Sequence, residues 1–250
     1  MNIKLNLNPR PRMKEQYKAD GKMMNILADE FQQDIKDKAR IAIHNSYRDF
    51  PISGGVSMII DFYTNRDLNI VGLVKNVVDS LNGVVFTDDI RVKSIVSKIH
   101  PAKEAAQETI TIDILSGREL DSLNCDASKF KRFVVLNVEA DSILEDNYLL
   151  YPSEINTSEV AGVNEKYDAL IVKEVGALYG GDRFEGPVDV SATFNIASED
   201  EGDLDNYAAN YLYNFEGSVI EAVHQIKSLH LIKRYVNKDK ENIEIEIKEK

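Results

Sequence analysis

The feature that most constrains the fold of this 250-residue chain is a pattern that occurs twice. Residues 55–62 (GVSMIIDF) and 187–194 (PVDVSATF) both place apolar side chains at every second position. This period of two predicts a strand with one buried face. A stripe of apolar residues at three- and four-residue steps follows each strand, within 70–81 and within 204–215, and predicts an amphipathic helix in each half.

The match between the halves continues past these helices. Each helix runs into a glycine, Gly83 or Gly217, where a glycine cap is expected. Residues 88–100 align without a gap with the start of 222–235. Each half ends in a strictly alternating segment, TITIDIL at 109–115 and NIEIEI at 242–247. Because an ungapped match from helix through strand seldom arises by chance, we infer that the chain arose by duplication.

The beginnings of the halves correspond more loosely. Opening strands are predicted at 3–7 and 133–138, and a helix is predicted over 23–48. The counterpart of this helix lies around Tyr167–Tyr179, after an acidic insertion that the first half lacks. Each half therefore has the predicted order β-α-β-α-β-β.

This order predicts an α/β (α+β) fold made of two repeats. We expect the first repeat at 1–116 and the second, with its acidic insertion, at 131–250. The polar segment 117–130 joins them as a linker.

The overall charge argues against contact with nucleic acid, since 42 acidic residues against 30 basic ones give a net charge of -12. The charge is uneven, however, because the first 22 residues are basic and most of the acidic excess lies within 139–205. The single cysteine excludes an internal disulfide, and the four histidines have no metal-ligand spacing. No apolar run approaches the ~18–20 residues of a membrane span, and no secretory signal core is present. A cytoplasmic protein without a membrane partner is therefore expected.

Residues 75–92 (KNVVDSLNGVVFTDDIRV) resemble the RusA family of Holliday junction resolvases, which is common in phages and prophages. The family signature begins with D-x-D-N and a lysine three residues later, followed by an aspartate and a leucine, a glycine turn and an Asp-Asp pair. The second half matches its beginning, at 203–206 (DLDN). The first half matches the later positions: Lys75, Asp79, Leu81, Asn82, Gly83, Asp88 and Asp89.

Neither half holds the complete signature. The first half reads 69–72 (NIVG) where D-x-D-N is expected. An alignment shifted by two residues would use Asp67 and Asn69 and would still keep only one carboxylate. The second half has Ala209 at the lysine position and Ala222-Val223 at the Asp-Asp position. The losses are complementary, so we expect the two repeats to form an intrachain pseudo-dimer with one composite site.

The resemblance implies a metal-dependent endodeoxyribonuclease that resolves branched DNA in a bacterial or phage-infected cell, either as this monomeric pseudo-dimer or as a homodimer. Clustered carboxylates that hold Mg²⁺, or alternatively Mn²⁺, would activate a water and clamp the scissile phosphate. Asp203, Asp205 and Asp89 are the predicted metal ligands, Asp88 is predicted to be catalytic with them, and Lys75 supplies a fixed positive charge. The predicted DNA-binding arm consists of Arg10, Arg12, Lys14, Lys18 and Lys22.

Each of these residues also has a purely structural interpretation. Asp203 or Asp205 fits a helix cap, Asp88-Asp89 fits a turn, and Lys75 fits an exposed helix position. The basic arm also fits a flexible basic terminus. Two other functions therefore stay open: an inactive RusA-like protein that binds junction DNA or a protein partner, and an acidic protein that mimics DNA or engages a basic partner.

Overall fold

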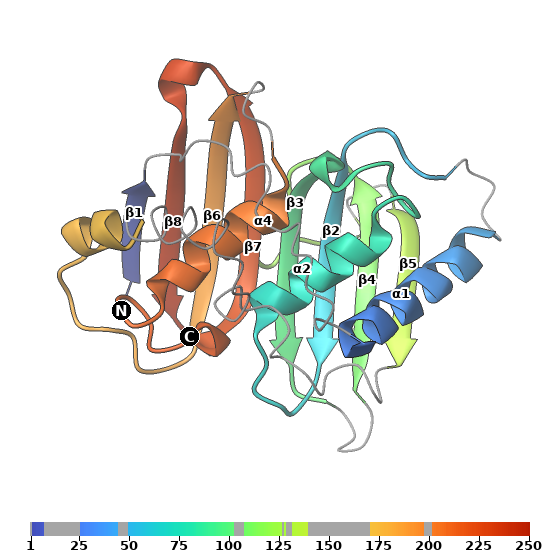
Figure 1. Ribbon diagram of the computed structural model, residues 1–250, viewed down its shortest axis with the longest axis horizontal. Coiled ribbons are helices and arrows are strands. Elements are labelled where there is room, and N and C mark those ends of the chain that lie inside the picture. The colour runs from blue at the N-terminus through green and yellow to red at the C-terminus, as the bar shows by residue number, and fades with distance from the viewer. Residues whose placement is uncertain are drawn as a thin grey trace.

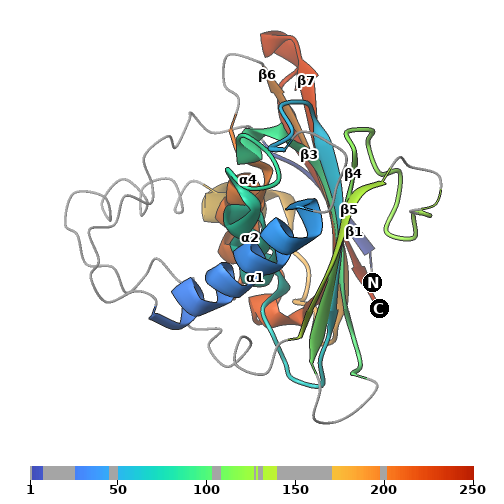
Figure 2. The ribbon, with the colours of Figure 1, turned by 90° about the vertical axis from the view of Figure 1, so that its right-hand side faces the viewer.

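The computed structural model describes residues 2–7, 26–44, 50–102, 108–126, 128, 132–139, 171–197 and 202–250. These residues form a mixed α/β fold in which helices cover one face of a single eight-stranded sheet (Figures 1 and 2). No helix among them is long and apolar enough to cross a membrane.

The predicted strands and helices are present within the described residues, and most of the acidic insertion lies outside them. The strands are β1 (Asn2–Leu7), β2 (Val56–Tyr63), β3 (Val92–His100), β4 (Thr109–Ser116), β5 (Arg132–Glu139), β6 (Val188–Ala197), β7 (Ile226–Val236) and β8 (Asn242–Glu249). The helices are α1 (Ile26–His44), α2 (Ile70–Leu81), α4 (Leu204–Leu212) and a helical segment at 171–178. Short 3₁₀ turns are η1 (Asp89–Arg91), η6 (Tyr213–Phe215), η7 (Val223–Gln225) and η8 (Lys238–Lys240).

The two halves of the chain share one continuous sheet, in the order β1-β8-β6-β7-β3-β2-β4-β5 (Figure 1). In the first half β2 pairs in parallel with β3 and antiparallel with β4. In the second half β6 pairs in parallel with β7 and antiparallel with β8. The halves join where β3 and β7 run antiparallel at the centre.

The outer strands cross between the halves. β1 begins the chain but pairs with β8, whereas β5 begins the second half but pairs with β4. Each half therefore receives its edge strand from the other. The predicted division at 117–130 lies between β4 and β5 and stays a prediction, because the sheet itself is undivided.

The helices pack on the apolar face of the sheet. Side chains that alternate along the strands, such as Met58 and Ile60 of β2, are fully buried there. Asn69 starts α2 by accepting hydrogen bonds from the backbone of Val71 (3.1 Å) and Gly72 (3.2 Å), the usual role of an asparagine N-cap. α2 and α4 contact each other, and each also contacts the central strand of the other half. This packing brings the functional segments of both halves together.

The described part of the predicted linker lies on the opposite face of the sheet from the helices (Figure 2). Ser57 Oγ donates to Arg118 O (2.6 Å), and Leu120 N donates to Ser94 Oγ (3.0 Å). His230 Nε2 donates to Leu120 O (2.7 Å). The segment is therefore hydrogen-bonded to strands of both halves.

Candidate metal centre

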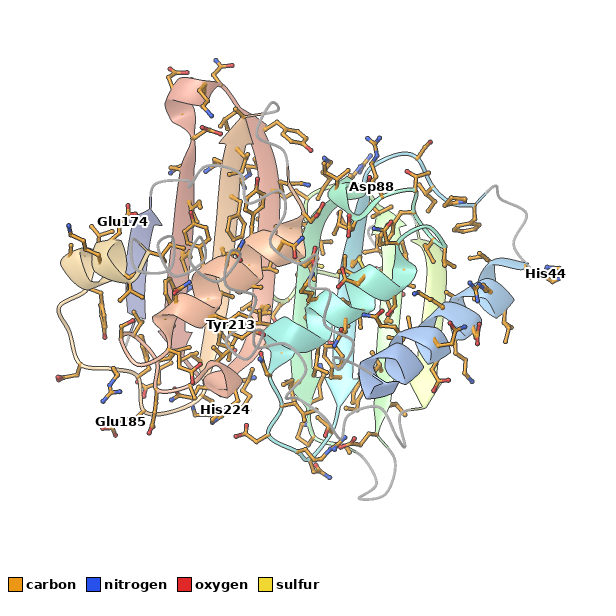
Figure 3. All side chains as sticks on the ribbon, viewed as in Figure 1. His44, Asp88, Glu174, Glu185, Tyr213 and His224 are labelled. Carbon is orange, nitrogen blue, oxygen red and sulfur yellow. The ribbon has the colours of Figure 1, made fainter. Side chains whose placement is uncertain are left out.

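The Asp88-Asp89 pair lies in the turn that leads into β3. Asp88 caps η1, because its Oδ1 accepts a hydrogen bond from Ile90 N (3.0 Å). This is the structural role that a turn aspartate is expected to have. Asp89 is half-buried within the same turn. Figure 3 shows Asp88 toward one end of the helical layer.

The second acidic segment is the start of α4. Asp203 occupies the N-cap position, yet its side chain caps no backbone N–H. Its Oδ2 instead accepts a hydrogen bond from Asn206 Nδ2 (3.0 Å). A capping role therefore does not account for the Asp203 carboxylate.

The structure brings these two segments together. Asp88, Asp89 and Asp203 each offer a carboxylate oxygen, and these three oxygens lie within 4.8 Å of one another. Two ligands on opposite sides of one Mg²⁺ would stand about 4 Å apart, since Mg–O bonds are about 2.1 Å. The three oxygens are therefore within about 1 Å of the spacing that one shared ion requires. Asp88 belongs to this acidic group, whereas Asp205, a predicted ligand, lies outside it.

Asp205 instead pairs with Lys75 from the other half. Lys75 Nζ lies 3.2 Å from Asp205 Oδ2 and 2.7 Å from Asn206 Oδ1. It also lies 3.2 Å from Asp79, one turn further along α2. Lys75 is therefore not the freely exposed helix lysine of the structural interpretation.

One oxygen of Asp205 is unusual. The residue is 2% exposed, and its Oδ1 has no hydrogen-bond partner among the described residues. A buried polar atom without a partner is destabilising and calls for a ligand, a water or a catalytic role. The negative charge of Asp205 contributes to the raised pKa of Asp89, so the Asp205 carboxylate lies within electrostatic range of the acidic group.

The electrostatics of the site favour a bound cation. Burial and the charges of Asp203 and Asp205 raise the pKa of Asp89 to about 8. Burial also raises the pKa of Asp205 to about 6, although the charge of Lys75 opposes the shift. Burial alone would lower the pKa of Lys75, but the charges of Asp205 and Asp79 raise it above its ordinary value. Since like charges repel here, a divalent cation would replace the protons that the carboxylates otherwise retain.

Sequence reasoning missed Lys233, which is buried beside the site. Its Nζ donates to Ile90 O (2.8 Å) in η1 and to Gly202 O (2.8 Å), directly before Asp203. It therefore ties together the two segments that carry the carboxylates. The sequence does contain an indication that Lys233 is buried. Lys233 follows Leu229 and Leu231 at every second position of β7, and both leucines are buried.

No protein-family model, curated protein or solved structure matches the chain. The resemblance to RusA resolvases therefore rests on the motif residues alone. The five residues of the predicted DNA-binding arm lie outside the described residues: Arg10, Arg12, Lys14, Lys18 and Lys22.

Proposed function

We propose that the chain is a RusA-like, metal-dependent endodeoxyribonuclease that acts on branched DNA through one composite site. The observation that carries this proposal is the meeting of Asp88 and Asp89 with Asp203, beside the Lys75–Asp205 ion pair. At this group of carboxylates, each half of the chain supplies the signature residues that the other half lacks.

We further propose that the two halves are related repeats arranged as a pseudo-dimer. The matching strand pairings support this, and so do the matching irregularities. The pairing of β2 with β3 shifts register between Val56 and Ser57, and that of β6 with β7 shifts between Val188 and Asp189. Gly83 and Gly217 also adopt the same left-handed conformation, with φ of 72° and 76°. Only glycine adopts such angles without strain.

The residues of the site suit phosphodiester hydrolysis. Asp88, Asp89 and Asp203 would hold Mg²⁺, or Mn²⁺ in its place. When bound, the ion would supply Lewis-acid activation of water and of the phosphate. Lys75 fixes Asp205 through Oδ2, which leaves Oδ1 available to orient a water. The positive charge of Lys75 also reduces the electrostatic repulsion between a DNA phosphate and the carboxylates of the site.

The negative net charge is compatible with DNA as the substrate. A cation would neutralise part of the charge of the acidic group. The basic arm at 10–22 would contact backbone phosphates, the main source of affinity in most DNA complexes. Binding that weakens steeply with added salt would support this role.

Cleavage of a labelled four-way junction tests the proposal. The intact chain should cut it in Mg²⁺ or Mn²⁺ and only bind it in Ca²⁺. Asp89→Asn and Asp203→Asn should each abolish cutting, because each removes one carboxylate of the shared group. Asp239→Asn, an exposed aspartate of η8, is the matched control and should cut normally. Normal cutting by either site variant would refute the composite site.

A second candidate is an inactive relative that binds junctions or a protein partner. The incomplete signature in each half favours it. Junction binding in Ca²⁺ without any cutting in Mg²⁺ or Mn²⁺ would select this function over the nuclease.

A further inference from the structure

Building on the proposed nuclease function, we infer that the chain has one cleavage site. The chain should therefore nick a single DNA strand, whereas a pseudo-dimer with two sites would cut two strands. Each residue of the acidic group aligns with a residue in the other half of the chain. These aligned residues lie where the start of α2 meets α4 and η7, and they show whether a second site exists.

The corresponding residues there have no ligand chemistry. Val71 of α2 takes the position of Asp205, and Val223 of η7 takes that of Asp89. Both valines are buried, at 2% and 3% exposed. Ala209 and Ala222 replace Lys75 and Asp88. None of these four side chains can hold a cation or donate a proton.

The remaining polar residue, Asn69, is fully engaged. It corresponds to Asp203, but its Oδ1 caps the backbone of α2. Its Nδ2 donates to Tyr213 OH (3.0 Å), which occupies the position of Asp79. The side chain that would start a second acidic group is thus used to cap α2 and to bond it to η6, the turn that follows α4.

Asp67 carries the carboxylate nearest to Asn69 in the sequence, and it is more exposed than the Asp203 carboxylate. Its side chain is 61% exposed and is paired with Lys227 and with His224 Nε2 (3.3 Å). Within the described ranges, the only close group of three or more acidic, histidine or cysteine side chains is Asp88, Asp89 and Asp203. Asp67 is therefore an ion-pair residue, and no third acidic, histidine or cysteine ligand among the described residues groups with it and His224.

The geometry also separates the two places. Figure 3 labels Asp88 toward the upper end of the helical layer, and Tyr213 and His224 toward the lower end. A single site at the upper end cannot reach a second phosphate at the lower end while the chain stays bound in one orientation. Each binding event should therefore break one phosphodiester bond by water, which leaves a nicked strand.

A supercoiled plasmid with an extruded cruciform tests this inference. The first nick releases the supercoiling and the cruciform is reabsorbed, so only two cuts within one binding event yield linear DNA. We expect nicked circles as the first product in Mg²⁺. Linear DNA as the first product would overturn the single-site inference and leave the nuclease function standing. An absence of all cutting in Mg²⁺ and Mn²⁺ would overturn both.

Two variants sharpen the result. Asp89→Asn should abolish nicking completely, whereas a second working site would preserve nicking in this variant. Asp67→Asn removes the carboxylate at the corresponding end and should leave the nicking rate unchanged. Residual nicking by Asp89→Asn, or its loss in a folded Asp67→Asn chain, would overturn the inference. Thermal melting of both variants checks that they fold.

Discussion

Lys75 Nζ on α2 lies 3.2 Å from Asp205 Oδ2 on α4, although the two residues stand 130 positions apart. The Asp205 side chain is 1% exposed and that of Lys75 is 16% exposed, so the pair is largely withdrawn from water. Replacing one residue of such a pair leaves the buried charge of the other residue without an opposite charge beside it. The contact therefore links the stability of the interface between α2 and α4 to the site.

Lys75→Met should destabilise the fold by about 3 kcal/mol, because Asp205 loses its cation while it stays buried. Urea unfolding followed by circular dichroism measures this change. The double variant Lys75→Met/Asp205→Leu should recover much of the loss, since no buried charge is left. Equal stability of Lys75→Met and the unchanged chain would contradict this account of the pair.

Asp89→Asn should stabilise the metal-free protein even though it removes a proposed ligand. The raised pKa of Asp89, about 8, means that its ionised form is unfavourable in the fold. At pH 8 the gain has an upper limit of about 5–6 kcal/mol, since each of the roughly four units of pKa shift corresponds to about 1.4 kcal/mol. Solvent screening of this half-buried group makes the expected gain smaller than that limit. Thermal melting in EDTA gives the comparison, with Asp239→Asn as the control. A less stable Asp89→Asn chain would show that Asp89 has a structural role instead.

The same raised pKa predicts how stability depends on pH. Between about pH 4 and 8 folded Asp89 holds a proton that the unfolded chain has released, because its pKa rises from 3.8 to about 8 on folding. The folded state binds more protons in this window, so the stability of the metal-free chain contributed by Asp89 falls as pH rises. Melting temperatures in EDTA from pH 5 to 9 should show this slope, and Asp89→Asn should flatten it.

Binding of Mg²⁺ should have the opposite dependence on pH. The ion must displace the proton of Asp89, and this becomes easier as pH approaches and passes the pKa of about 8. Millimolar Mg²⁺ should therefore raise the melting temperature more at pH 8.5 than at pH 6. An equal increase at both values would mean that the ion binds elsewhere.

Much of the fold follows from local sequence patterns. The alternation in β2 and β6 and the apolar stripes of α2 and α4 specify which faces are buried, and these faces meet in the core. The crossing of β1 to β8 and of β5 to β4 was not predicted. Strand partners far apart in the chain depend on how the sheet assembles, which alternation within one strand does not encode.

The site was predictable in part for a similar reason. Family resemblance identified Lys75, Asp88 and Asp89 in one half and Asp203 and Asp205 in the other. The sequence did not specify that they meet, because this depends on α2 and α4 packing across the junction of β3 and β7. It also did not specify which carboxylates group most closely, since that depends on the ion pair that draws Asp205 toward Lys75.

Lys233 gives the last prediction, because it holds the two acidic segments together through Ile90 O and Gly202 O. Lys233→Met keeps the length of the side chain but removes its donors. It should weaken Mg²⁺ binding by about 10–100-fold, as loss of a group that orients metal ligands commonly does. Calorimetric titration with Mg²⁺ measures this effect. Lys227→Met changes a lysine of the same strand that pairs with Asp67, and it should bind Mg²⁺ normally. If Lys233→Met folds and binds Mg²⁺ as tightly as Lys227→Met, Lys233 does not position the carboxylates.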